Sequence, residues 1–200
     1  MADTEGVVDY AHTASGLLKA MWTKRDNAEL RWRGCTVHAI HIGEYEDNRV
    51  QILEDGTVDT EFDDLDDTVA WNFLLLDIDY IVSRPEPEAP GREPAFWVAP
   101  ATLEFSLASG IVAKISDGSA DPVRLPPGIT TTNLVMSEVR QVGPDGKTDP
   151  LWRITGEGFA ISLCDAGFRL YIRAEPQLVH RPSLEMAERG GISFDQRSFA

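Results

Sequence analysis

The sequence predicts an α+β domain that is mainly antiparallel β-structure, either one curled sheet or a two-sheet sandwich, with an N-terminal helix and a short C-terminal helix. Short apolar segments of period two recur along the chain, and Gly- and Pro-containing breaks separate them. Strands do not alternate with amphipathic helices, as a parallel nucleotide-binding sheet would require. At 200 residues, residues 1–200 fit one domain that can bury ~70% of its unfolded surface.

The two helices are expected near the ends of the chain. Residues 7–22 carry apolar side chains at helical spacing, which predicts one broad buried face. Ser183 is expected to cap a short helix that runs to Arg189 and stops at Gly190 and Gly191, because glycine favours the left-handed conformation that ends helices.

The first predicted strand follows Leu30, where the period changes to two. Cys35, Val37 and Ala39 are expected on one face, and Thr36, His38, Ile40 and Ile42 on the other. Further strands are predicted at residues 49–53, 69–82, 96–105 (interrupted at Pro100) and 110–115. Two hairpins are predicted next, the first pairing 133–142 with 151–155 and the second pairing 158–164 with 168–174. Residues 54–67 are expected to form an acidic loop, and residues 83–94, with four prolines, a Pro-rich loop.

The charge balance is strongly acidic. Asp and Glu number 33 against 18 Lys and Arg, so the formal net charge is −15 and the pI about 4.5. Such a charge repels nucleic-acid phosphates and anionic lipid head groups, and it attracts cationic surfaces. We therefore expect neither nucleic acid nor membrane as a partner, and a basic protein as the partner if there is one; simple solubility is the alternative.

The cysteines and the N-terminal sequence predict a cytoplasmic protein. Cys35 and Cys164 lie in apolar, strand-like segments, where a buried, reduced thiol is the usual state. The first residues carry neither a basic start nor a long apolar run, so no secretion signal is expected. No segment approaches the ~20 apolar residues of a membrane-spanning helix.

The first candidate site is the pair Asp77 and Asp79. On a strand they share one face with backbones ~6.6 Å apart, while Leu76, Ile78 and Tyr80 form the core face. Two neighbouring carboxylates suit general acid–base hydrolysis or a divalent cation. The alternative is a solvated or cross-strand-paired face.

Other catalytic and metal chemistry is not supported by the sequence. His38 and His41, three apart on a strand, are expected on opposite faces and therefore cannot bind one metal ion. No nucleophile elbow or phosphate-binding glycine loop is present, and neither cysteine lies beside a basic residue. We expect no cofactor and no metal.

The second candidate site is the acidic loop, whose functional interpretation is docking onto a basic partner. Its densest residues are Glu61, Asp63, Asp64, Asp66 and Asp67. A third hypothesis places a small apolar ligand inside a β-barrel between Trp71, Trp97 and Phe105, although aromatic residues at this density more often fill a core.

Three segments carry a resemblance to a known group. Residues 32–40 (Trp-Arg-Gly-Cys-Thr-Val-His-Ala-Ile) resemble the opening Trp-His-Asp-Ala motif of small bacterial proteins of unknown function, some of whose relatives are grouped with immunity proteins of polymorphic toxin systems. Residues 76–81 and 96–105 look like two later blocks of the same group. Arg33 and Gly34 replace the histidine and aspartate, so no role of that pair is transferred. The resemblance implies a β-rich domain without an established activity and with a partner-binding role.

Together these observations predict a non-enzymatic protein-interaction domain, of the immunity or accessory type, that binds a basic partner. The alternatives are a hydrolase or cation-binding enzyme centred on Asp77 and Asp79, and the apolar-ligand barrel.

Overall fold

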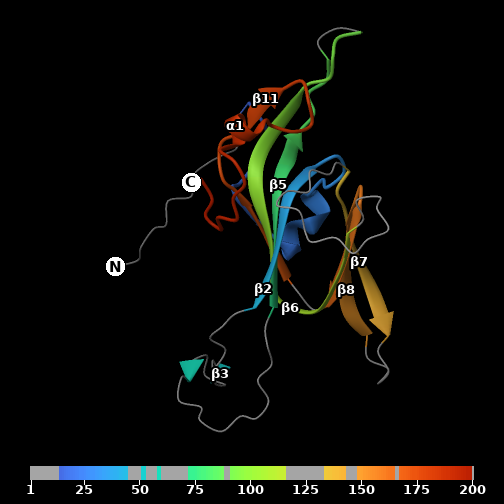
Figure 1. The fold of residues 1–200 in the computed structure, drawn as a ribbon. Helices are drawn as coiled ribbons and strands as arrows, with labels where there is room; N and C mark the ends of the chain where they lie inside the picture. The colour runs from blue at the N-terminus through green and yellow to red at the C-terminus, as the bar shows by residue number, and fades with distance from the viewer. Residues whose placement is uncertain are drawn as a thin grey trace.

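The computed structural model describes residues 14–44, 51–52, 58–59, 72–87, 91–115, 133–142, 148–164 and 167–199 (Figure 1). The helical elements are a 3-10 helix, η1 (Lys24–Glu29), and one short α-helix, α1 (Met186–Arg189). The strands are β1 (Met21–Thr23), β2 (Thr36–Glu44), β3 (Gln51–Ile52), β4 (Val58–Asp59), β5 (Asn72–Ser83), β6 (Phe96–Ile115), β7 (Val135–Val142), β8 (Thr148–Gly156), β9 (Phe159–Cys164), β10 (Gly167–Ile172) and β11 (Gln177–Val179). The prediction of mainly antiparallel β-structure is confirmed.

The long strand β6 joins the sheet together (Figure 1). Its first part pairs with β5 on one edge and with β10 and β11 on the other. Its second part pairs with β9, which continues through β8 to β7. The sheet is extended by β1 beside β10 and β2 beside β5, and all these pairs are antiparallel. Strands β3 and β4 form a separate two-stranded pair.

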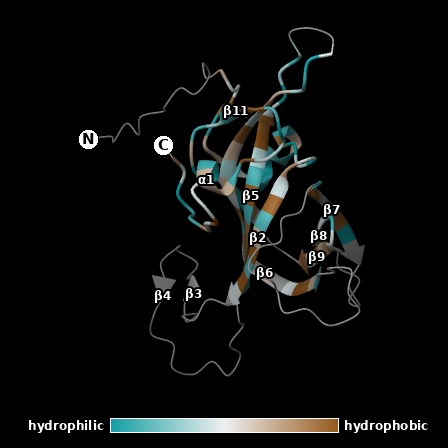
Figure 2. Ribbon diagram, turned by 45° about the horizontal axis from the view of Figure 1, so that its top comes forward, coloured by the Kyte–Doolittle hydropathy of each residue, from teal (hydrophilic) through white to brown (hydrophobic). Residues whose placement is uncertain are grey.

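The apolar core lies on one face of this sheet. Alternate residues of β5, Leu74, Leu76 and Ile78, have no exposed surface and point into it. Trp152 packs edge-on against Phe168, with ring centroids 5.4 Å apart and planes at 85°. Such edge-to-face geometry is favoured between aromatic rings. Figure 2 shows the hydrophobic residues mainly on the strands and hydrophilic ones along the described connection between β5 and β6.

The predicted N-terminal helix is wrong for residues 14–22. They contain a turn, an irregular segment and the start of β1, which pairs with β10. Trp22 is buried in the core from this strand. The apolar spacing that suggested a helix thus arises from a strand and the turn before it, and residues 7–13 lie outside the described residues.

The short C-terminal helix is confirmed, although its start differs. It spans Met186–Arg189 with Glu185, not Ser183, at the N-cap. Gly190 adopts φ 78° and ψ 22° at the C-cap. This left-handed conformation is easy for glycine and ends the helix as predicted.

The predicted interruption at Pro100 is wrong, because β6 is continuous from Phe96 to Ile115. The N–H and C=O of one strand residue point to the same edge, and the Pro100 carbonyl accepts a bond from the Arg173 N–H at 2.9 Å. On that edge β10 ends opposite Ala101 and β11 begins opposite Val98. Proline therefore lies where no paired strand needs its missing N–H.

The two halves of β6 were predicted as separate strands, 96–105 and 110–115. In the structure they are joined through a bulge between Ser109 and Val112, where Gly110 adopts φ 58°. A bulge bends a strand without ending it.

The first predicted hairpin is confirmed by β7 and β8, but the second is wrong. Strands β9 and β10 do not pair with each other; both pair with β6. Cys164 lies opposite Ser109 and Gly167 opposite Ser106, so the register continues along the same edge of β6. The hairpin instead joins β8 to β9, with Gly156 opposite Phe159.

Candidate functional site

Asp77 and Asp79 lie on the face of β5 opposite the core, as predicted, and both have no exposed surface. Asp77 pairs with Thr102 and Asp79 with Pro100 on β6. The segment that follows β11 covers this face. Buried carboxylates are costly unless they are paired and hydrogen-bonded, so their partners decide what they can do.

Two arginines provide the compensating charge. Arg189, from α1, donates to Asp77 Oδ1 at 2.6 Å and Oδ2 at 2.7 Å, and to Asp79 Oδ1 at 3.1 Å. Arg173, just after β10, donates to Asp77 Oδ1 at 2.5 Å. Burial lowers the pKa of Arg173, opposed by Asp77; burial acts the same way on Arg189, but hydrogen bonds and charge from Asp77 and Asp79 raise its pKa. Both guanidinium groups are therefore charged at neutral pH.

The remaining oxygens of the pair bind backbone amides and a histidine. The N–H of Ser193 donates to Asp77 Oδ2 at 3.2 Å, and that of Leu184 to Asp79 Oδ2 at 2.7 Å. His38 Nε2 lies 2.8 Å from the same Asp79 oxygen. All four carboxylate oxygens thus have partners, and the pair fixes the C-terminal segment to the sheet. Hydrolysis at this pair is not the chemistry that the geometry favours.

The prediction that His38 and His41 lie on opposite faces of β2 is wrong. Val37 pairs with Ile78 and Ala39 with Asp77, so His38 is the extra residue of a bulge. The bulge reverses the alternation after Val37. As a result Ala39 and His41 share the Asp77 face, where we had expected His41 opposite His38. Among the described residues no three His, Cys, Asp or Glu side chains are close enough to hold a metal ion.

The described part of the predicted acidic loop, Val58–Asp59, is strand β4 and not loop. Glu61, Asp63, Asp64, Asp66 and Asp67 lie outside the described residues, as does most of 54–67. The structure does place its two attachment points side by side, because Glu44 at the end of β2 pairs with Asn72 at the start of β5. The connection between two neighbouring antiparallel strands therefore comprises residues 45–71.

The surplus negative charge is concentrated outside the described residues. The described ranges contain 16 Asp and Glu against 15 Lys and Arg, a net charge of −1. The rest of the sequence contains 17 acidic residues against 3 basic ones, a net charge of −14. The 45–71 connection alone holds ten acidic residues and one arginine. The described part of the chain is thus nearly neutral.

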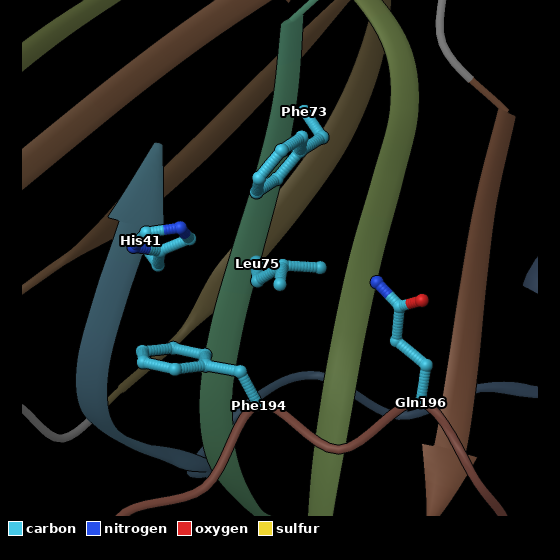
Figure 3. A pocket seen from close by; sticks show the side chains of 5 residues that line it. All are labelled: His41, Phe73, Leu75, Phe194 and Gln196. Carbon is cyan, nitrogen blue, oxygen red and sulfur yellow. The ribbon is translucent and has the colours of Figure 1, made fainter. Parts of the chain in front are cut away.

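A cavity of about 270 Å³ (Figure 3) lies near the end of β2 and the start of β5. It is lined by His41 of β2, Phe73 and Leu75 of β5, and Phe194 and Gln196 of the C-terminal segment. The His41 ring lies between two phenyl rings, with its centroid 5.4 Å from that of Phe73 and 5.5 Å from that of Phe194. Phe73 packs across Gly43, its cross-strand partner, where a Cβ atom would lie 2.3 Å from the ring.

The residues proposed for an apolar ligand do not meet in one cavity. Phe105 has no exposed surface and packs on Trp152 and Phe168. Trp97 lies eight residues away, ~26 Å along β6, and lines a different cavity beside Leu17 and Phe199. Trp71 lies outside the described residues.

The cysteines are both free, with Cys35 fully buried and Cys164 half-buried. Burial raises the pKa of the Cys35 thiol to about 12. A thiol with a raised pKa is a poor nucleophile, because the thiolate is the reactive form. Cys35 is therefore a core residue.

Sequence reasoning missed Arg173, Arg189 and the cavity. The two arginines lie 96 and 112 residues from Asp77, so no local spacing could indicate the pairing. The one available signal was the pair of aspartates itself, which needs cations if both faces of β5 are covered.

Comparisons with known proteins add no relative. No family model, curated protein or solved structure matches the chain. The similarity to the bacterial immunity-type group therefore stays a prediction. Within the described ranges, no helix has the length and apolar character needed to cross a membrane.

Proposed function

We propose that this chain is a cytoplasmic, non-enzymatic protein-interaction domain, of the immunity or accessory type, whose nearly neutral sheet carries an acidic segment that binds a basic partner. The observation that carries the proposal is the connection between β2 and β5. The adjacent pairing of Glu44 with Asn72 needs a loop of only about 2–5 residues. The chain instead uses residues 45–71, with ten acidic residues and one basic one.

A connection of this length and charge needs a reason other than folding. Loops longer than about 12–15 residues with no secondary structure of their own are uncommon inside compact domains and are often functional. In this connection the strands that the structure describes are the two-residue β3 and β4. Solubility could be served by acids spread over the whole surface, but the described residues are nearly balanced in charge. Concentrated charge speeds encounter with a partner of opposite sign and disfavours other partners.

The contacts of Asp77 and Asp79 support a structural role for this pair, which the sequence had suggested as a catalytic site. Its oxygens already accept bonds from Arg189, Arg173, His38 and two backbone amides. A general acid or base must reach a substrate proton. A substrate would first have to displace the arginines and the covering segment.

The experiment is an affinity purification from the source cell, followed by binding measurements with the recovered protein. We expect a cationic protein whose affinity falls steeply between low and physiological salt, because exposed charges are screened. The variant Asp63→Asn/Asp64→Asn/Asp66→Asn/Asp67→Asn should weaken binding at least tenfold.

A matched control neutralises four exposed acidic residues that lie among the described residues. The variant Glu86→Gln/Glu93→Gln/Glu157→Gln/Glu175→Gln changes the net charge by the same amount. It should keep most of the affinity. Equal losses in the two variants would show that total charge, and not the acidic segment, attracts the partner. No loss in either would remove the electrostatic proposal altogether.

A further inference from the structure

We propose that the cavity formed by His41, Phe73, Leu75, Phe194 and Gln196, here called the anchor pocket, receives one apolar side chain of the basic partner. The inference rests on the proposed function and locates where such a partner makes its apolar contact. Four observations carry it: the lining of the pocket, its size, its openness to solvent and its position.

The lining of the pocket selects an uncharged group. Two phenyl rings, an imidazole ring and a leucine form its walls, and the other polar group is the Gln196 amide. Among the described residues, no Asp, Glu, Lys or Arg lines it. A charged group would lose its hydration there without gaining an ion pair, so the part of the ligand that enters is apolar.

The size of the pocket suits a side chain. Its volume of about 270 Å³ lies below the range of about 300–1,000 Å³ that is typical of sites for small organic ligands. His41 and Gln196 are exposed at its rim, whereas Leu75 is 6% exposed at its floor. In Figure 3 the Leu75 and Gln196 side chains point toward each other across the space between β5 and the C-terminal segment.

The position of the pocket indicates a cationic partner. The pair Gly43–Phe73 is adjacent to the Glu44–Asn72 pair, from which the 45–71 connection leaves the sheet, and His41–Leu75 lies two pairs further along the same two strands. Residues 45–71 carry ten acidic residues and one basic residue, so a net charge of −9 is attached next to an apolar cavity. A side chain that fills an apolar pocket is a common anchor in protein interfaces, and opposite charge on the two partners speeds their encounter and excludes wrong partners.

The test uses two synthetic lysine-rich peptides that differ at one central position, leucine in the first and alanine in the second. Binding of each to the full chain is measured by titration calorimetry at low salt. We expect the leucine peptide to bind about tenfold more tightly, because the pocket removes most of an aliphatic side chain from water. The His41 ring protons should shift in NMR spectra with the leucine peptide only.

Two variants and a control complete the cycle. Phe194→Ala removes one wall and Gln196→Trp fills the space, so each should reduce the affinity difference between the peptides to less than twofold while leaving alanine-peptide binding unchanged. Val135→Ala also shortens an exposed apolar side chain, 49% exposed on β7, and should keep the full preference.

The outcomes separate the two proposals. Equal affinity of the native chain for both peptides, or a preference that survives Gln196→Trp, overturns the anchor pocket and leaves the acidic segment untouched. Equally tight binding of a neutral leucine peptide would show that the pocket accepts apolar groups without a basic partner, which also overturns the inference. If the affinity for the alanine peptide changes neither with salt concentration nor in the Asp63→Asn/Asp64→Asn/Asp66→Asn/Asp67→Asn variant, the proposed function itself is contradicted.

Discussion

Replacing Arg189 with methionine should be among the most damaging single changes to this fold. The Arg189 side chain has no exposed surface and is bonded to both Asp77 and Asp79. Methionine fills similar space but leaves two buried carboxylates with Arg173 as the remaining arginine. Removing one member of a buried ion pair typically costs about 3–5 kcal/mol, because the other charge stays buried without compensation.

The expected loss should be visible in equilibrium unfolding, both by heat and by urea. For a chain of this length each kcal/mol lowers Tm by about 2–4 °C, so Arg189→Met should lower Tm by roughly 10 °C. Arg189→Lys keeps the charge but lacks the planar fork that reaches both carboxylates, so its loss should be intermediate. Hydrogen exchange at the Leu184 and Ser193 amides, which donate to the two aspartates, should accelerate in both variants.

The matched control removes an arginine from the same segment at an exposed site. Arg197 pairs with Asp195, and its side chain is 86% exposed, so Arg197→Met should leave the unfolding midpoint unchanged. If Arg189→Met unfolds at the same urea concentration as this control, the cluster contributes nothing to stability. The account of Asp77 and Asp79 as structural residues would then be wrong.

Two further perturbations test the core. The pKa of the Cys35 thiol is about 12 in the folded protein and about 9 in the unfolded chain. Its contribution to the free energy of unfolding is therefore complete below pH 9 and decreases as the pH rises toward 12. Urea unfolding at pH 8 and pH 11 should show this fall, and Cys35→Ala should reduce it; an identical fall in the variant would assign the effect to other groups. Trp152→Ala, at the centre of the aromatic cluster with Phe105 and Phe168, should cost about 3–5 kcal/mol, and a loss below 1 kcal/mol would contradict its place in the core.

The strand content of the fold was predictable because alternation is a local property. The 69–82 segment became β5 with the expected faces, and Gly190 ended the C-terminal helix as expected. What failed was pairing. Two residues separate Cys164 from Gly167 in a turn-like sequence, yet the strands on either side continue along β6. Local turn residues do not reveal whether a strand folds back or carries on, because the third strand decides it.

The candidate site was predictable in its residues but not in its chemistry. The pattern identified Asp77 and Asp79 and their common face, but their role depends on Arg173 and Arg189, which are distant in sequence. The extra residue in β2 is a second feature that the sequence pattern did not reveal. A single bulge at His38 reversed the faces of the residues after it, and no feature of the segment 35–42 marks its position.

Strand β6 has a consequence for how this protein tolerates change. Its first twelve residues or so supply the neighbour of β5, and its last ones supply the neighbour of β9. A one-residue deletion near Ser106 would therefore change the register of one part of β6 relative to the other, so that β5 and β9 could not both keep their pairing. Lengthening the Glu157–Gly158 turn would disturb neither pairing. Sequence drift and engineered insertions should accordingly accumulate at such turns, and the middle of β6 should be the part of the chain least able to change in length.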